Sequence, residues 1–177
     1  MALLEGVVLW RRDRGIVNRE RDLEFLRLSI EVAERAKAKG NHPFGAVLVH
    51  ESGEILATGE NSFLTDRGPG HAETNLARLA AREFDSDKLA ASTLYTSVEP
   101  CSMCSGTIYW ANIGAVVFGM TERRLLDLTS GHAENQTQDL PCRTIFASGQ
   151  RKVEVRGPFV ELEAALVAQH SSFWATR

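Results

Sequence analysis

Cysteine is scarce in this chain, with three residues among 177. An odd number of cysteines, two of them arranged as C-x-x-C, does not make the disulfide framework of a secreted protein. Reduced thiols suit the cytosol, so we expect a cytoplasmic location. A run of about 18 or more apolar residues, which a membrane-spanning helix needs, is also missing, so we expect no membrane partner.

The chain also lacks an excess of basic residues. Lys and Arg together number 20 and Asp and Glu 23, which gives a formal net charge of -3 at pH 7. Proteins that grip phosphate backbones carry a basic surface, so we expect no nucleic-acid partner. The hydrophobic content of 44% and charged content of 24% are those of an ordinary globular protein.

Repeats, linkers and low-complexity tracts are absent as well, and 177 residues suit one compact domain. We therefore predict a single domain over residues 1–177. Within it, residues 1–17 are a lead-in, and residues 158–177 form a C-terminal helix and tail.

Hydrophobic periodicity, buried apolar runs and β-branched stretches predict the order of the elements. Helices are predicted at 18–39, 71–84, 100–112 and 158–170, with a short one at 143–147. Strands are predicted at 44–49, 54–58, 93–98, 115–119 and 152–156. We predict loops at 61–70 and over most of 121–141. A hairpin followed by strands that alternate with helices indicates an α/β fold, a three-layer α/β/α sandwich with a five-stranded mixed sheet.

Two short strings carry the chemistry: His71-Ala72-Glu73, and Pro100-Cys101-Ser102-Met103-Cys104. Each opens a predicted helix, and the two cysteines, at i and i+3, share one helix face. One histidine and two thiolates suit zinc, and three protein ligands leave the fourth position open, as in catalytic sites. Glu73 is placed to exchange a proton with water at that position.

Each string has a plainer reading when taken alone. A C-x-x-C can be a redox pair or half of a structural zinc site, and Glu73 can be a first-turn carboxylate that complements the helix dipole. The two strings occur together in the expected order and context, which favours the catalytic zinc site. The third cysteine, Cys142, has no partner and is predicted to be structural.

The pattern H-x-E followed by P-C-x-x-C is the signature of the zinc nucleobase deaminases. On these residues the chain resembles the cytidine deaminase-like superfamily, from Phe44 through Phe118. The resemblance implies that His71, Cys101 and Cys104 bind Zn²⁺ and that Glu73 is the catalytic proton shuttle. It also implies a hydrolytic reaction, in which an amino group leaves a ring carbon as ammonia.

Within the superfamily the chain is similar to guanine deaminases of the bacterial type. The matching strings are PFGAV at 43–47, GEN at 59–61, HAE at 71–73, LYTSVEPCSMC at 94–104 and GTIYWA at 106–111. In that group the counterpart of Asn61 hydrogen-bonds the base and that of Phe44 packs beside it. From the residues alone, Asn61 is equally a turn former, and for Phe44 a place in the core is favoured. Ala72, Trp110 and Trp174 complete the predicted substrate-binding set, with the core as the alternative for Trp110.

The segment around His132 is the most open part of the prediction. Some similar enzymes use a second carboxylate in the corresponding loop; Glu134 is the candidate, with Asp139 and His132 as rivals. From the residues alone, Glu134 is equally a solvated loop carboxylate. The aromatic pair Phe173-Trp174 either caps an active site or folds onto its own core. Related enzymes are dimers with exchanged C-termini, so the resemblance implies a homodimer in which the tail caps a neighbour's site.

The main hypothesis is a zinc-dependent aminohydrolase that converts guanine to xanthine plus ammonia, with a small-molecule nucleobase as its substrate. The alternatives are deamination of cytosine, of an aminotriazine, of a nucleoside or of tRNA adenosine. From another class of protein, a catalytically silent zinc-binding subunit is the rival. Glu73 counts against that rival, because a silent subunit needs no general base beside its metal.

Overall fold

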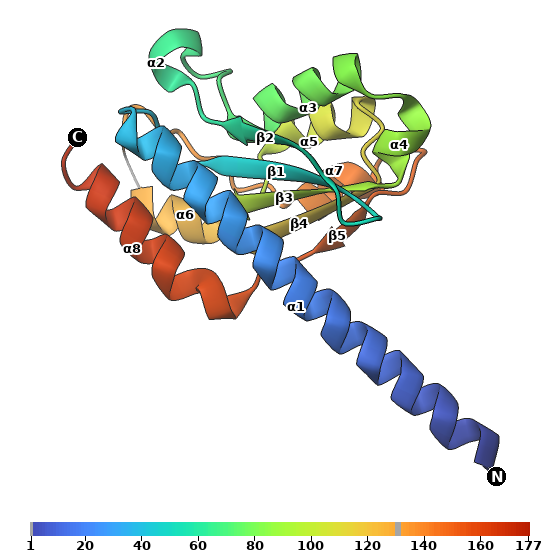
Figure 1. The fold of residues 1–177 in the computed structure, drawn as a ribbon. Coiled ribbons are helices and arrows are strands. Elements are labelled where there is room, and N and C mark those ends of the chain that lie inside the picture. Colours follow the sequence, from blue (N-terminus) through green and yellow to red (C-terminus); the bar gives the residue numbers. More distant parts are fainter. Residues whose placement is uncertain (1, 130–131) are drawn as a thin grey trace.

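A single mixed sheet forms the centre of the protein (Figure 1). The computed structural model describes residues 2–129 and 132–177. The strands are β1 (Gly45–His50), β2 (Ile55–Glu60), β3 (Ser92–Val98), β4 (Ala115–Met120) and β5 (Glu154–Arg156), in the spatial order β2-β1-β3-β4-β5. β1 is antiparallel to β2 and β3, whereas β3, β4 and β5 are parallel. The predicted α/β class and five-stranded mixed sheet are confirmed.

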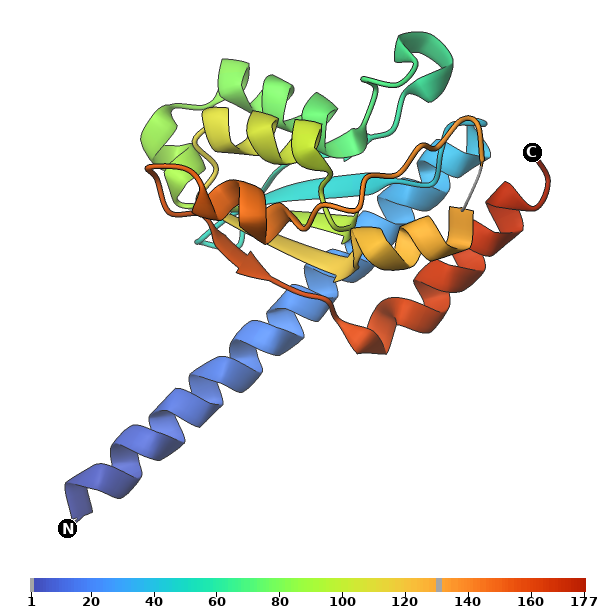
Figure 2. The same ribbon diagram turned by 180° about the vertical axis from the view of Figure 1, so that it is seen from behind.

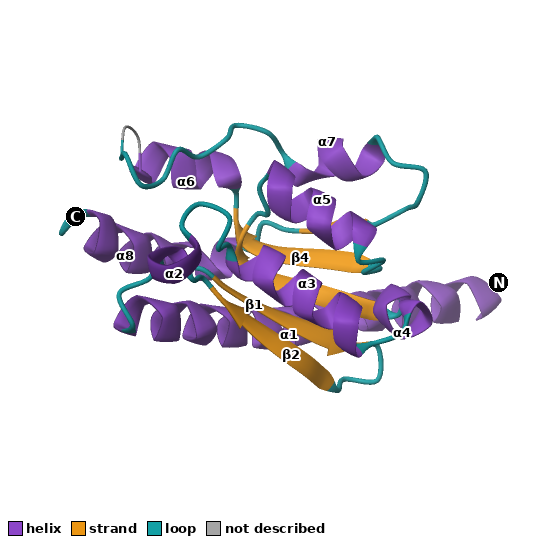
Figure 3. Cartoon of the chain, turned by 90° about the horizontal axis from the view of Figure 1, so that it is seen from above, coloured by secondary structure: helices purple, strands orange, loops and turns teal. Residues whose placement is uncertain are grey.

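Helices cover both faces of this sheet (Figures 1 and 2). One face carries α3 (Ala72–Glu83), α5 (Ser102–Trp110) and α7 (Cys142–Ala147), and the other carries α1 (Ala2–Ala38), α6 (Glu122–Thr129) and α8 (Glu163–Trp174). Three short helices complete the chain: α2 (Phe63–Asp66), α4 (Ser86–Ala90) and the 3-10 helix η1 (Val160–Leu162). Seen from above, α3 and α5 lie side by side over the strands (Figure 3).

The alternation of side chains along the strands divides the core in two. Leu48, Leu94 and Val116 pack under α3, α5 and α7, while their neighbours Val47 and Val117 pack under α1 and α8. Successive side chains of a strand point to opposite faces, so a sheet covered on both sides needs apolar residues at every position. This is why β1 and β4 are almost continuous apolar runs.

Contact between α1 and β1 is too close for a side chain at Gly45. A Cβ atom at that position would lie 2.4 Å from the backbone nitrogen of Ala33 and 2.4 Å from the carbonyl oxygen of Ser29. Glycine therefore lets the first strand dock directly on the helix backbone, which fixes the layer that lies behind the site.

Several elements differ from the sequence predictions, among them α4, which lies where no helix is predicted. α1 begins at Ala2 rather than near Asn18, so the lead-in is largely helical; it contains no proline to stop a helix. Met1 lies outside the described residues. α6 occupies Glu122–Thr129, where a loop is predicted, and α2 falls inside the 61–70 loop. The last helix begins at Glu163, after η1, and ends at Trp174.

None of the helices in the described ranges has the length and apolar character that crossing a bilayer requires.

Candidate metal and active site

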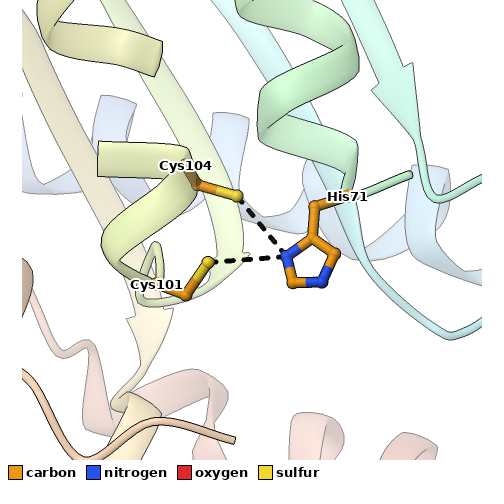
Figure 4. Close-up of side chains that lie close together, drawn as sticks. All are labelled: His71, Cys101 and Cys104. Carbon is orange, nitrogen blue, oxygen red and sulfur yellow. Dashed lines mark hydrogen bonds between the residues drawn. The ribbon is translucent and has the colours of Figure 1, made fainter. Parts of the chain in front are cut away.

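Two helix N-termini bring the predicted ligands together. His71 is the N-cap residue of α3 and Cys101 that of α5, and Cys104 lies in the first turn of α5. β3 leads directly into the Pro100-Cys101 turn, and α3 packs beside α5 on the same face of the sheet. Because both helices begin at the same edge, the imidazole and the two thiols point toward one another (Figure 4).

The geometry of these three side chains suits a metal ion. Their ligand atoms all lie within 4.8 Å of one another. His71 Nδ1 is 3.6 Å from Cys101 Sγ and 3.5 Å from Cys104 Sγ. Tetrahedral zinc with ordinary Zn–N and Zn–S bond lengths separates a nitrogen from a sulfur ligand by about 3.6 Å. The three residues thus fit a zinc ion with one coordination position left open.

Electrostatics at Cys101 also favours a metal, whereas the hydrogen bond to Cys101 and burial raise the pKa of Cys104. Hydrogen bonds from Cys104 and His71 lower the pKa of Cys101, so this thiol ionises first. Thr74 Oγ1 lies 3.3 Å from Cys104 Sγ and adds a polar contact to the second sulfur. A thiolate is the form that binds zinc, so both observations point to the same use.

Glu73 lies on the first turn of α3, beside the three ligand residues. It is buried, with 4% of its surface exposed, and its Oε1 accepts a 2.6 Å hydrogen bond from Thr96 Oγ1. Its Oε2 lies 3.4 Å from Cys104 Sγ, so the free end of the carboxyl group is turned toward the ligands. Burial raises the pKa of Glu73, which makes a proton easier to hold there. This is the environment of a general acid–base group.

A cavity of about 550 Å³ opens in front of these residues. His71, Glu73 and Cys101 line it, together with the aromatic residues Phe44 and Phe63 and the segment 133–138. The ring of Phe44 is nearly parallel to the imidazole of His71, with an interplanar angle of 11° and ring centroids 6.3 Å apart. A pocket of this size, apolar on one side and polar on the other, suits a small planar ligand.

Of the other predicted substrate-binding residues, Asn61 and Ala72 lie next to this cavity rather than on its wall. Asn61 is buried; its N–H donates to the Phe44 carbonyl, and its Oδ1 accepts from the Phe63 N–H at 2.9 Å. The side-chain oxygen of Asn61 thus forms a turn, as the alternative interpretation predicts. Its two hydrogen bonds hold Phe44 and Phe63, which line the cavity. Ala72, the first residue of α3, is fully buried in the core with Leu76 and does not line the cavity.

Glu134 does line the cavity, together with Glu73. Its Oε2 accepts hydrogen bonds from Arg177 at 2.6 Å and, at 3.3 Å, from His42 Nε2. Neither rival holds this position: Asp139 pairs with Arg123 at 2.8 Å outside the cavity wall. The other rival, His132, rests against the ring of Trp174.

Trp174 folds onto its own chain. Its Nε1–H donates to His170 Nδ1 at 3.2 Å, and its ring lies 4.8 Å from that of His42. Trp174 and Phe173 are each only 7% exposed. In the single chain, Phe173 and Trp174 therefore fold onto their own core, as the alternative interpretation predicts. Neither residue lies on the cavity wall.

Trp110 is misplaced by both sequence interpretations. It is 85% exposed, so it is not a core residue, and it lies in a shallow surface groove between α3 and α5 instead of the cavity. Met103 lines the groove as well as the cavity. The reason is the helical repeat: Trp110 is six residues after Cys104, which places it about 120° away around α5.

Two buried carboxyl groups at the site have no role in the sequence predictions. Glu99 accepts hydrogen bonds from the backbone N–H groups of Glu122 at 3.2 Å and Cys142 at 3.0 Å, so it ties the starts of α6 and α7 to the turn before Cys101. Glu122 lines the cavity, and burial, with the charges of Cys101, Glu73 and Glu99, raises its pKa to about 9. Glu99 directly precedes Pro100 and Cys101, and this position could have indicated a place at the site. No neighbouring motif in the sequence indicates the same for Glu122.

The zinc-binding region of cytidine and deoxycytidylate deaminases matches residues 19–120 of this chain. The chain belongs to this family. The match contains all three ligand residues and Glu73, and the donor set fits the zinc that names the region. The protein is accordingly a zinc-type deaminase, a hydrolase of the cytidine deaminase-like fold.

Relatives within this deaminase family differ in substrate. A probable cytosine deaminase of Schizosaccharomyces pombe is 36% identical over 155 residues, which cover 88% of this chain and 93% of the relative. The guanine deaminase of Bacillus subtilis is 42% identical over 96 residues, 53% of this chain and 61% of its own. A tRNA-specific adenosine deaminase of Haemophilus influenzae is 37% identical over 111 residues, 62% and 64% of the two chains.

Solved deaminase structures agree with the fold. A guanine deaminase from Nitrosomonas europaea superposes with a TM-score of 0.69 over 85% of this chain and 83% of its own, at 24% identity. That likeness extends over 85% of the chain, whereas the family match is confined to residues 19–120.

Proposed function

We propose that this deaminase acts on a free nucleobase, with guanine as its preferred substrate, and releases xanthine and ammonia. The observation that carries the proposal is the buried carboxyl group of Glu73 beside an open three-ligand metal site, at the base of a small cavity walled by Phe44. Likeness to guanine deaminases in sequence and in fold supports guanine as the first base to test.

Zinc, when bound by His71, Cys101 and Cys104, supplies a Lewis acid that makes a water molecule acidic. Glu73 takes a proton from the attacking water and delivers it to a ring nitrogen of the base. The amino group leaves as ammonia after receiving a further proton, so one water is consumed for each ammonia formed. Glu134, which also lines the cavity, is the proposed second carboxylate for this transfer.

Recognition of the base falls to the aromatic wall. The flat face of a purine suits the apolar side of the cavity, where Phe44 and Phe63 lie. The Oδ1 atom of Asn61 is already engaged by the Phe63 N–H, and its Nδ2 donates no hydrogen bond within residues 2–129 and 132–177. Asn61 lies beside the cavity wall and not on it, so its contact with the base stays a prediction. Ala72 and Trp174 stay predictions as substrate-binding residues.

Cytosine is the second candidate, because the Schizosaccharomyces relative, a probable cytosine deaminase, matches over 93% of its length. The two proposals differ in the size of the ring. A cavity of about 550 Å³ leaves room for the two-ring base, which favours guanine. The net charge of -3 continues to disfavour tRNA adenosine.

The deciding experiment measures ammonia release by the zinc-loaded protein on guanine, guanosine, cytosine, cytidine, adenine, an aminotriazine and tRNA. We expect the highest kcat/KM on guanine. A higher value on cytosine would replace guanine by the second candidate, and silence on every small molecule would overturn the nucleobase proposal.

Glu73→Gln tests the mechanism in the same assay. The variant keeps the size of the side chain but loses the titratable group, so we expect full zinc content and a kcat at least about 100-fold lower. Glu83→Gln, an exposed carboxylate at the end of the same helix, is the matched control and should turn over normally. Equal activity of the two variants would remove Glu73 from its role.

A homodimer is the remaining part of the proposal. The groove between α3 and α5 presents Trp110 and Met103 to solvent, and a second copy of the chain is the occupant we assign to it. Exchange of C-termini stays a prediction. Sedimentation of the protein and of Trp110→Lys tests the groove, since a monomeric wild type or a dimeric variant would contradict it. A cytoplasmic location likewise stays a prediction.

A further inference from the structure

His42 is a buried histidine that has no role in the steps above. It is 3% exposed, and its ring stacks on Phe63, with centroids 4.1 Å apart and an interplanar angle of 22°. The rings of Phe44, Phe173 and Trp174 meet it edge-on. Two of these four aromatic residues, Phe44 and Phe63, belong to the cavity wall. His42 thus joins the wall of the cavity to the end of α8.

The one polar contact that the His42 side chain makes in the described part of the chain is with Glu134. Nε2 lies 3.3 Å from Glu134 Oε2, and because a carboxylate only accepts, the ring donates through Nε2–H. Burial lowers the pKa of His42 to about 4, so at neutral pH the ring is an uncharged donor. A neutral donor orients a carboxylate without exchanging a proton with it.

Arg177 holds the same oxygen from the other side. Its Nη1 donates to Glu134 Oε2 at 2.6 Å, its Nη2 donates to the carbonyl of Gly40, and its guanidinium lies 4.8 Å from the centroid of Phe173. Three separate contacts fix this side chain, and only a quarter of it is exposed. A guanidinium anchored in this way presents a defined N–H instead of a freely rotating charge.

We propose that His42 and Arg177 are positioning residues that hold the Glu134 carboxylate in the wall of the cavity that His71 and Cys101 also line. The proposal rests on the proposed function only in assigning Glu134 to proton transfer. Glu134 belongs to a segment without regular structure and is 37% exposed, so without two donors on one oxygen its carboxylate would turn to water. Fixing it in place removes that reorganisation from the reaction.

This arrangement also explains the tail. Residues 173–177 continue α8 past the sheet to a position beside His42, where Phe173 supports the guanidinium and Trp174 covers the imidazole. The tail of this chain thus acts on its own active site through Glu134, although neither aromatic residue lines the cavity.

The experiment compares Arg177→Ala and Arg177→Lys with the wild type in the deaminase assay. We expect Arg177→Ala to lower kcat about 3- to 10-fold with KM little changed, since a partly exposed ion pair is modest in strength. Lysine keeps the positive charge but lacks the planar, paired N–H donors of the guanidinium. Arg177→Lys should therefore retain part of the activity that Arg177→Ala loses. Arg123→Ala is the matched control, because Arg123 pairs with Asp139 of the same segment but away from the cavity.

A double-mutant cycle separates positioning from general stability. If Arg177 acts through Glu134, Arg177→Ala should change kcat less than about 2-fold in a Glu134→Gln background. An equal loss in both backgrounds would overturn the proposal. If Glu134→Gln itself retains full activity, Glu134 has no part in proton transfer and the proposal fails as well.

Hydrogen exchange tests the contact without any substrate. Backbone amides of 132–138 should exchange faster in Arg177→Ala than in the wild type, and unchanged rates would overturn the proposal. A wild type that is inactive on guanine but active on another base refutes the guanine proposal alone, and the same cycle is then run on that base. His42→Gln, which retains an N–H donor, should preserve more activity than His42→Phe.

Discussion

Thr96 on β3 donates a 2.6 Å hydrogen bond to Oε1 of Glu73 on α3. The threonine is completely buried, and it approaches the carboxylate from the sheet beneath the helix. With Oε1 held from below, Oε2 is left on the side of the ligands, 3.4 Å from Cys104 Sγ. A strand residue thus orients Glu73, the proposed acid–base group, from the sheet that lies beneath its helix.

Thr96→Val should therefore impair catalysis without removing the metal. Valine has nearly the shape of threonine and lacks the hydroxyl, so Glu73 loses its anchor while the core stays filled. Loss of an outer contact of this kind typically costs about 10- to 100-fold in activity, and we expect kcat to fall within that range with zinc content unchanged.

The control for this prediction is Thr93→Val, on the same strand and outside the site. Its side chain makes no hydrogen bond within the described ranges, so turnover should be unaffected. Steady-state kinetics with metal analysis of all three proteins provides the measurement. Normal kcat in Thr96→Val would show that Glu73 needs no anchor.

The metal site was predictable because its information is local. His71 and Glu73 lie two residues apart, Cys101 and Cys104 three, and each pair opens a helix that follows a turn or a strand. Thr96 and His42 could not be predicted as partners of the site, because their contacts join segments 23 and 92 residues apart. No spacing rule connects such positions before the sheet is assembled.

The fold shows the same division. Four strands are nearly continuous apolar or β-branched runs, and these were predicted closely, whereas α6 was missed because the polar residues after Thr129 mask its short apolar face. Leu125 is buried against the core, and the start of α6 is held by Glu99. Such a helix depends on tertiary contacts more than on its own sequence.

Glu99→Gln should destabilise the protein by about 1–3 kcal/mol. The buried carboxylate satisfies the N–H groups of Glu122 and Cys142, and an amide can accept only one of them while it turns a donor toward the other. Urea unfolding measures the change, with Glu54→Gln on the exposed hairpin as control. Identical midpoints for the wild type and Glu99→Gln would contradict the double capping.

Replacing each of two glycines by alanine should change the stability of the protein in opposite directions. Gly45→Ala would place its Cβ 2.4 Å from two backbone atoms of α1, which cannot move aside as a side chain can, so a loss of about 1–3 kcal/mol is expected. Gly106→Ala, inside α5, has no heavy atom within 4 Å of the added carbon and should gain about 0.5–1 kcal/mol. Unfolding free energies of both variants measure this; a neutral Gly45→Ala would require a wider gap between α1 and β1.

The decrease of the unfolding free energy at acidic pH should depend on His170. Its imidazole is fully buried and accepts the Trp174 indole N–H at Nδ1, and burial lowers its pKa to about 3. The unfolded chain, with an ordinary histidine pKa near 6.5, binds more protons than the folded protein between these two values. Stability is therefore complete above about pH 6.5 and falls as the pH drops toward 3, by up to about 1.4 kcal/mol per pH unit.

His170→Gln removes this titration, so its unfolding free energy should fall less steeply than that of the wild type between pH 6.5 and 4, even if it is lower at pH 8. His50→Gln, at the turn between β1 and β2, is the control and should keep the wild-type slope. Zinc binding also weakens in acid, but it does so in all three proteins, so the difference in slope isolates His170. Urea unfolding at four pH values supplies the data, and parallel curves for His170→Gln and the wild type would show that the buried imidazole does not govern the decrease at acidic pH.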